Sequence, residues 1–217
     1  MEQFHMHMEQ GNWHKAMNYM LDSFEAGSQY ISIVLLGMLK DNLVESGKEA
    51  GQNLMKVVSK IDSKRPLSFG DWCNDILPVL VQEAVESLHD HPLSQSLSGI
   101  INRKHNIFLG GKDAQSIVQI RNEYKGHSTT LSDVIYKDAV MMLYPRLQEF
   151  WEALSPLEGY DAEGNLFPLI HNDEAGHPYI FQSLKEESIS FISVSEDART
   201  IISDRYNDAF DSWMQAI

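Results

Sequence analysis

Arg121, Asn122 and His127 have the side chains needed to act on a phosphate, and they lie within seven consecutive positions. A guanidinium stays ionised and its fork of N–H groups fits phosphate oxygens. An imidazole moves protons near neutral pH, and an amide can orient either group by hydrogen bonding. These residues could therefore cleave RNA through its own 2′-hydroxyl without a metal, since that reaction needs proton transfer and a cation beside the phosphorane oxygens.

A helix over residues 113–126 is predicted to position these side chains. Its apolar residues recur at spacings of three and four, as on a buried helix face: Ile117, Ile120 and Tyr124. Asp113 suits the N-terminal cap, and Gly126 suits the left-handed residue that stops a helix. An unbroken helix would turn His127 about 240° away from Arg121. A chain reversal at Gly126 could bring the two together.

The segment Ile-Arg-Asn-Glu-Tyr-Lys-Gly-His-Ser resembles the motif of the HEPN superfamily, an arginine, a polar residue directly after it, and a histidine four to six positions further on. It is similar to the Arg-Asn…Gly-His version of bacterial HEPN-like domains, including ones fused in front of kinases and ATPases. The resemblance implies a small helical bundle and a homodimer in which two motifs face each other. It also implies a ribonuclease in a bacterial defence or toxin-like system, with His127 as acid or base, Arg121 stabilising charge and Asn122 orienting one of them.

The charge distribution separates the motif from the rest of an acidic chain. The net charge is −14, which by itself disfavours a nucleic-acid partner. Residues 99–128, however, carry a net charge of +3, whereas residues 155–217 hold 12 Asp and Glu against 3 Lys and Arg. The basic residues beside the motif are predicted to bind the substrate: Arg103, Lys104, Lys112 and Lys125. A solvated helix face would explain the same charges.

Residues 1–154 are predicted to form a mainly α helical bundle. Amphipathic stripes indicate helices over residues 21–42 and 54–61, and over residues 68–88 with Ser68 as cap and a kink or division at Pro78. Residues 89–111 are expected to be a connection. A last helix starting at Ser132 is predicted to bend at Pro145 and to bury one side, made of Ile135, Ala139, Met142, Leu143, Phe150, Trp151 and Leu154.

Residues 155–217 are predicted to be an acidic appendage with a different periodicity. Short runs rich in β-branched and aromatic residues at 166–170, 179–184 and 189–194 favour a small antiparallel β meander. A capped amphipathic helix is expected from Ser195 to Trp213.

Several alternatives accompany this interpretation. Arg121 could pair with a carboxylate of the bundle while His127 caps the helix carbonyls. The chain would then be a non-catalytic sensor or adaptor that dimerises and binds a protein partner through its acidic C-terminal part. Metal clusters at His5, His7 and His14, and at His89, Asp90 and His91, are rejected because both lie in predicted loops or ends and lack suitable partners. No cofactor is expected, and Cys73 is interpreted as a small apolar filler.

The composition indicates a cytoplasmic protein. No apolar run is long enough to span a bilayer, the N-terminus lacks the pattern of a signal peptide, and a single cysteine fits a reducing compartment. The expected partners are a second copy of the chain, RNA and a protein, with no membrane.

Overall fold

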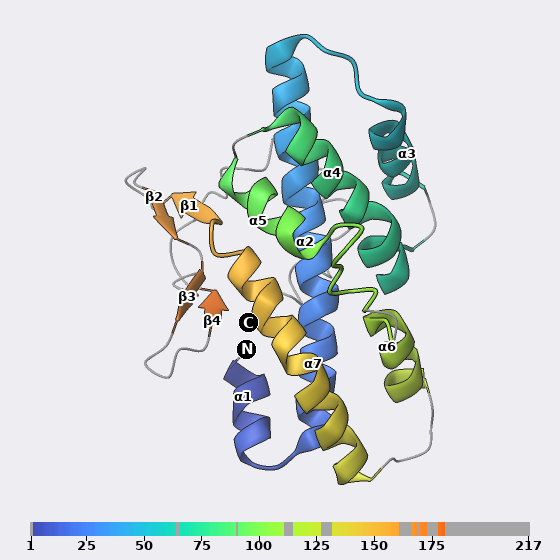
Figure 1. Ribbon diagram of the computed structural model, residues 1–217, viewed down its shortest axis with the longest axis vertical. Helices are drawn as coiled ribbons and strands as arrows, with labels where there is room; N and C mark the ends of the chain where they lie inside the picture. Colours follow the sequence, from blue (N-terminus) through green and yellow to red (C-terminus); the bar gives the residue numbers. More distant parts are fainter. Residues whose placement is uncertain are drawn as a thin grey trace.

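The protein is mainly α-helical, with its helices arranged around one long central helix. The computed structural model describes residues 2–63, 66–89, 91–110, 115–126, 132–160, 166–168, 170–172 and 178–180. In chain order the helices are α1 (Glu2–Glu9), α2 (Trp13–Ser46), α3 (Gln52–Ile61), the π-helix η1 (Asp71–Ile76), α4 (Leu77–Ser87), α5 (Pro92–Ile100), α6 (Ile117–Gly126) and α7 (Asp133–Ala153). Figure 1 shows α2 running the length of the bundle, with α1, α4, α6, α7 and η1 in contact with it.

The helix predicted over residues 21–42 is confirmed and is longer at both ends. It comprises 34 residues, so its axis is about 50 Å long. The Asn12 side chain caps its start by accepting from the Lys15 N–H at 3.4 Å, and Gly47 ends it with a φ of 65°. Both ends therefore follow the usual capping chemistry of Asn and Gly.

Gly27 allows α2 and α7 to approach closely. A Cβ atom at this position would lie 2.6 Å from Cε1 of Phe150, closer than two carbons can come without displacing the ring. Phe150 stacks on Phe24 with ring centroids 6.0 Å apart, and Phe108 packs edge-on against both. This cluster joins α2, α7 and the connection between α5 and α6 in the centre of the core.

The kink or division predicted at Pro78 takes the form of a change of helix type, from the π-helical turn η1 to α4, at the residue before the proline. The Leu77 N–H donates to the Trp72 carbonyl five residues earlier, and Pro78 then occupies the first turn of α4. Proline cannot donate to the carbonyl four residues before it and its ring collides with that carbonyl in a regular helix. The wider turn of η1 accommodates both effects.

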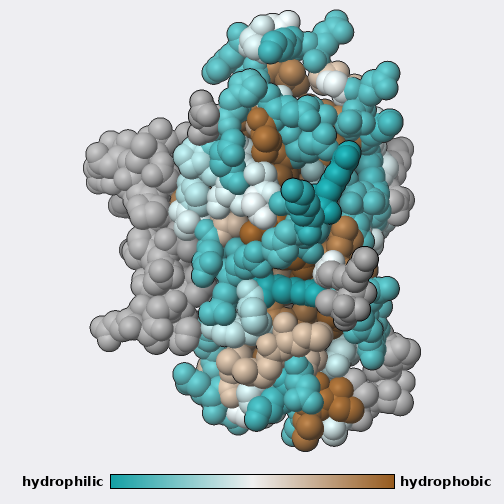
Figure 2. Space-filling view, viewed as in Figure 1, coloured by the Kyte–Doolittle hydropathy of each residue, from teal (hydrophilic) through white to brown (hydrophobic). Residues whose placement is uncertain are grey.

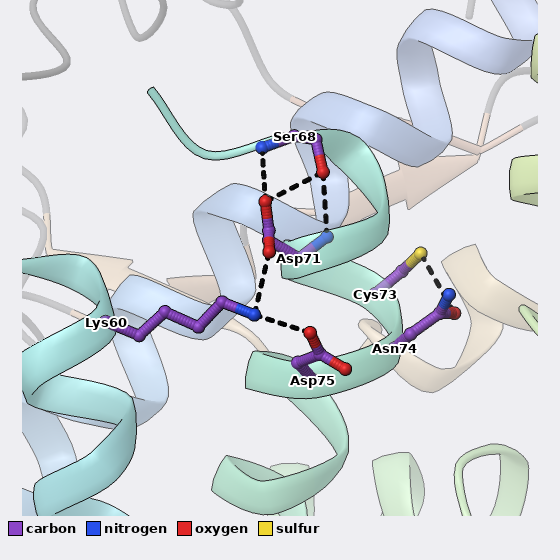
Figure 3. Close-up of polar contacts among 6 residues, drawn as sticks. All are labelled: Lys60, Ser68, Asp71, Cys73, Asn74 and Asp75. Atoms are coloured by element: carbon purple, nitrogen blue, oxygen red, sulfur yellow. Dashed lines mark hydrogen bonds and ion pairs between the residues drawn. The ribbon is translucent and has the colours of Figure 1, made fainter. Parts of the chain in front are cut away.

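A polar cluster, the Lys60 cluster, attaches α3 to η1 and consists of Lys60, Ser68, Asp71 and Asp75 (Figure 3). Lys60 Nζ lies 2.7 Å from Asp71 Oδ1 and 2.5 Å from Asp75 Oδ2. Ser68 is the predicted cap: its Oγ accepts from the Asp71 N–H at 3.2 Å, while Asp71 Oδ2 accepts from the Ser68 N–H at 2.8 Å. Partial burial disfavours the ammonium, but hydrogen bonds and charge from Asp71 and Asp75 outweigh it and raise the pKa of Lys60.

Two helices were not predicted from the sequence. Helix α5 lies where only a connection was expected: Pro92 occupies its first turn, the favoured place for proline, and Leu93 and Leu97 are buried. Helix α1 contains His5 and His7, both buried, so this end of the chain forms a helix and not a loop.

Helix α7 follows Ser132, as predicted, but part of its buried face is wrong. Ile135 and Met142 are 43% and 48% exposed. The buried face is centred on Leu143 and extends through residues that the prediction omitted, Tyr136, Val140 and Leu147. Because each residue advances about 100° around a helix, Ile135 and Met142, each one position before a buried residue, lie beside this face. Pro145 lies inside the helix, and the bend there stays a prediction.

The strands form two separate antiparallel pairs in the described part of residues 158–180. Strand β1 (Glu158–Tyr160) pairs with β2 (Leu166–Pro168), and β3 (Ile170–Asn172) pairs with β4 (Pro178–Ile180). A continuous meander is not supported by these pairings, and the third expected strand and the C-terminal helix lie outside the described residues. The predicted boundary at residue 154 falls just before Leu157, which is buried against the bundle. Among the described helices none is long and apolar enough to cross a membrane.

Candidate functional site

The motif helix α6 begins with a capping box rather than at Asp113. Ser116 Oγ accepts from the Gln119 N–H at 3.2 Å, and Gln119 Oε1 accepts from the Ser116 N–H at 3.0 Å. A serine followed three residues later by glutamine satisfies two N–H groups that the first helical turn leaves free. Ser116 is therefore the cap of α6, and Asp113 lies outside the described residues.

The start of α6 is fixed to the core by hydrogen bonds that involve its main chain. The Ile117 N–H donates to the Phe108 carbonyl at 2.8 Å, and Phe108 belongs to the central aromatic cluster. Arg146 of α7 donates to the Gln115 carbonyl at 3.0 Å. Ile117 and Ile120 are fully buried, as their spacing predicted. The helix thus holds one face against the bundle and presents its polar residues at the edge of that contact.

Arg121 forms an ion pair with Glu25 in the middle of α2. Its Nε donates to Glu25 Oε2 at 3.0 Å, and the two side chains are 31% and 24% exposed. The ring of Phe69 lies 6.0 Å from the guanidinium carbon. Among the described residues, no hydrogen bond occupies the terminal nitrogens Nη1 and Nη2 of Arg121. One edge of the guanidinium is therefore held by Glu25.

A second ion pair runs beside the first. Lys125 pairs with Asp22, one helical turn from Arg121 and Glu25 on their respective helices. Positions separated by three on α2 and by four on α6 lie on one helix face, so the two pairs form one line, the α2–α6 seam of Asp22, Glu25, Arg121 and Lys125. The charges of the seam balance, so its two cations are not an unpaired basic patch.

Of the other two predicted catalytic residues, the structure describes Asn122, which is exposed on α6. His127 lies outside the described residues, as does Lys112, so the approach of His127 to Arg121 stays a prediction. Nearby at the end of α6, Tyr124 contacts Tyr136 of α7 with ring centroids 5.6 Å apart, and Tyr136 in turn contacts His14 of α2 at 4.9 Å.

The predicted substrate-binding residues Arg103 and Lys104 are exposed in the turn after α5. Asn102 Oδ1 organises this turn by accepting from the N–H groups of Lys104 and His105, at 2.9 and 3.0 Å. His105 pairs with Glu149 of α7. Within the described residues no ion pair joins Arg103 or Lys104 to α6. The structure therefore brings Arg121 and Lys125 together and leaves Arg103 and Lys104 on another segment.

Other candidate groups have structural explanations. Cys73 is fully buried, and burial raises the pKa of its thiol to about 12, so it is a filler rather than a nucleophile. Buried His7 stacks on Tyr19, with ring centroids 5.4 Å apart. In the part of the chain that the structure describes, no three His, Cys, Asp or Glu residues are grouped so as to hold a metal.

Sequence reasoning missed the acidic half of the site. Glu25 lies 96 positions from Arg121, and pairing between distant residues leaves no trace in local periodicity. A weak signal was available, because Asp22 and Glu25 share one face of a helix whose other faces are strongly apolar. The Ser116–Gln119 capping box was also readable in the sequence.

Comparison of the chain with protein-family models, with curated proteins and with solved structures found no match in any of the three.

Proposed function

We propose that the chain is a metal-independent endoribonuclease of HEPN type that works as a homodimer. One observation carries this proposal: Arg121 is held through Nε, is partly exposed, and has its two terminal nitrogens unoccupied among the described residues. A fixed guanidinium with a free edge suits the oxygens of a phosphate. In the reaction, Arg121 stabilises charge growing on the phosphorane, and Asn122 orients the reacting groups.

His127 completes the proposed chemistry. Its imidazole takes the proton of the 2′-hydroxyl or gives one to the leaving 5′-oxygen, and two copies of the motif across a dimer supply both steps. Arg103, Lys104, Lys112 and Lys125 contribute contacts to the RNA backbone. A bacterial defence or toxin-like role is part of this proposal, and its support is the resemblance of the Arg-Asn…Gly-His segment.

The test is cleavage of total RNA by the purified protein in EDTA, beside the His127→Ala protein. We expect fragmentation by the wild-type protein and a rate about 100- to 10,000-fold lower in the variant. Cleavage that disappears when EDTA is added to the wild-type protein, or that His127→Ala retains, would show the assignment to be wrong. Light scattering of the same samples should give twice the 24.7 kDa mass of one chain.

A second candidate function is a non-catalytic adaptor, and two observations favour it. The ion pairs of the seam are the arrangement expected if Arg121 is structural. In addition, α7 exposes four apolar side chains outside its buried face, Val134, Ile135, Met141 and Met142. Figure 2 shows a mixed face, with hydrophobic colour at its lower end, where α7 begins in Figure 1, and also in its upper half. Apolar surface of this kind suits a protein contact. A wild-type protein inert on every RNA would favour this function.

A further inference from the structure

The carboxylate of Glu25 determines which edge of Arg121 is available. Arginine has five N–H groups in a planar fork, and the bond from Nε to Glu25 Oε2 at 3.0 Å uses one of them. Glu25 belongs to the central helix α2, whose neighbouring residues Phe24 and Ala26 are buried or half-buried. The anchor is therefore on a rigid element, in contrast to a carboxylate on a loop.

A second contact restricts the plane of the guanidinium. Phe69, which is 2% exposed, precedes η1 and lies 6.0 Å from the guanidinium carbon. The first turn of that segment is itself fixed by the hydrogen bonds between Ser68 and Asp71. Arg121 is thus held along one edge by a charge and approached by a ring that cannot move freely.

We propose that Glu25 is a positioning residue for Arg121, an inference that rests on the proposed ribonuclease function. It holds Nε so that Nη1 and Nη2 point together at one phosphate. Positioning of this kind raises the rate because a charged group that is fixed in advance needs no reorganisation during reaction. Glu25 itself does not touch the substrate.

This role makes a specific kinetic prediction. Glu25 is negative and repels RNA, so its removal should not weaken binding of the substrate. It should lower the rate of the chemical step, because Arg121 then samples several rotamers. A residue that only stabilised the fold would instead lower the melting temperature and leave the kinetic constants of the folded enzyme unchanged.

The experiment compares Glu25→Ala and Glu25→Gln with the full-length wild-type protein on one RNA that the wild type cleaves. Glu25→Ala should lower kcat about 100-fold, the scale of a small misplacement of a catalytic group, with KM unchanged or lower. Glu25→Gln should recover part of the loss, since its amide oxygen still accepts from Nε. Glu45→Ala is the matched control, because it makes the same change at the C-terminal end of α2 and should keep kcat.

The outcomes separate this inference from the function on which it rests. A wild-type protein that cleaves no RNA overturns the proposed function and the inference together. An active wild type whose kcat survives Glu25→Ala overturns only the inference, as does a Glu25→Ala protein with raised KM and unchanged kcat. If Glu25→Ala fails to fold, Glu25→Gln decides: a kcat equal to wild type contradicts the proposal, and a reduced kcat at wild-type melting temperature supports it.

Discussion

The Lys60 cluster and the α2–α6 seam both join helices by ion pairs, but Lys60 and Arg121 contact different numbers of carboxylates. Lys60 uses its ammonium on two carboxylates at once, Asp71 and Asp75. Arg121 meets one carboxylate through one nitrogen. The exposed fractions of the two cations are similar, 26% and 31%. What distinguishes the sites, within the described residues, is the number of carboxylates that each cation contacts: the Lys60 cluster is a junction, and the seam is where we propose that a ligand binds.

The largest expected effect is on the rate of RNA cleavage, which should depend on the seam and not on the Lys60 cluster. Arg121→Ala should lower the rate of RNA cleavage about 100- to 1,000-fold, the range found when a group that stabilises transition-state charge is removed. Lys60→Ala should leave the rate unchanged. Both rates are measured on a labelled RNA in EDTA, with circular dichroism melts of each protein. The comparison fails if the two variants lose cleavage equally.

A smaller effect, on the free energy of unfolding, is expected within the Lys60 cluster. Asp71→Ala removes one of the two carboxylate partners of Lys60 and the acceptor of the Ser68 N–H at the helix start, so it should cost about 1–3 kcal/mol of unfolding free energy. Urea unfolding followed by circular dichroism measures this change.

The control for that measurement is Asp75→Ala, which removes the other partner of Lys60. Asp75 is 58% exposed, and exposed ion pairs contribute less than about 1 kcal/mol. Equal losses in the two variants would show that the capping contacts of Asp71 contribute nothing.

The smallest expected effect is a dependence on alkaline pH. The pKa of Lys60 is raised in the folded protein, so its stabilising contribution is complete below the ordinary lysine pKa and is lost as pH rises through the folded value. Lys60→Met should therefore lose less stability than the wild type when melts are compared on the two sides of pH 10.5, the ordinary lysine value. Parallel losses in the two proteins would contradict this assignment.

Local features of the fold could be predicted from the sequence. The apolar stripes of α2 and α3, the cap at Ser68, the break at Pro78 and the start of α7 after Ser132 all depend on residues within a few positions of one another. Helix α5 could also have been predicted, because Leu93, Leu97 and Ile100 recur at helical spacing after a first-turn proline. Three serines between them hid this pattern, whereas other failures concern contacts between distant segments.

The candidate site also has a part that the sequence predicts and a part that it does not. The stripe of Ile117 and Ile120 placed Arg121 at the edge of a buried helix face, as its periodicity indicated. The identity of its partner could not be predicted, because Asp22 and Glu25 become neighbours of α6 only after the chain folds. Ile135 and Met142 were misplaced for a related reason: each precedes a buried residue, and a run of adjacent apolar residues does not define which of them faces the core.

The contact between Gly27 and Phe150 bears on how this sequence can vary. A methyl group at position 27 would occupy space that the ring now fills, at 2.6 Å from Cε1. A chain that keeps the spacing of α2 and α7 can therefore enlarge residue 27 only if residue 150 becomes smaller. The two positions, far apart along the chain, should change together during divergence. Any alignment of sequences sharing this bundle should show them as a correlated pair.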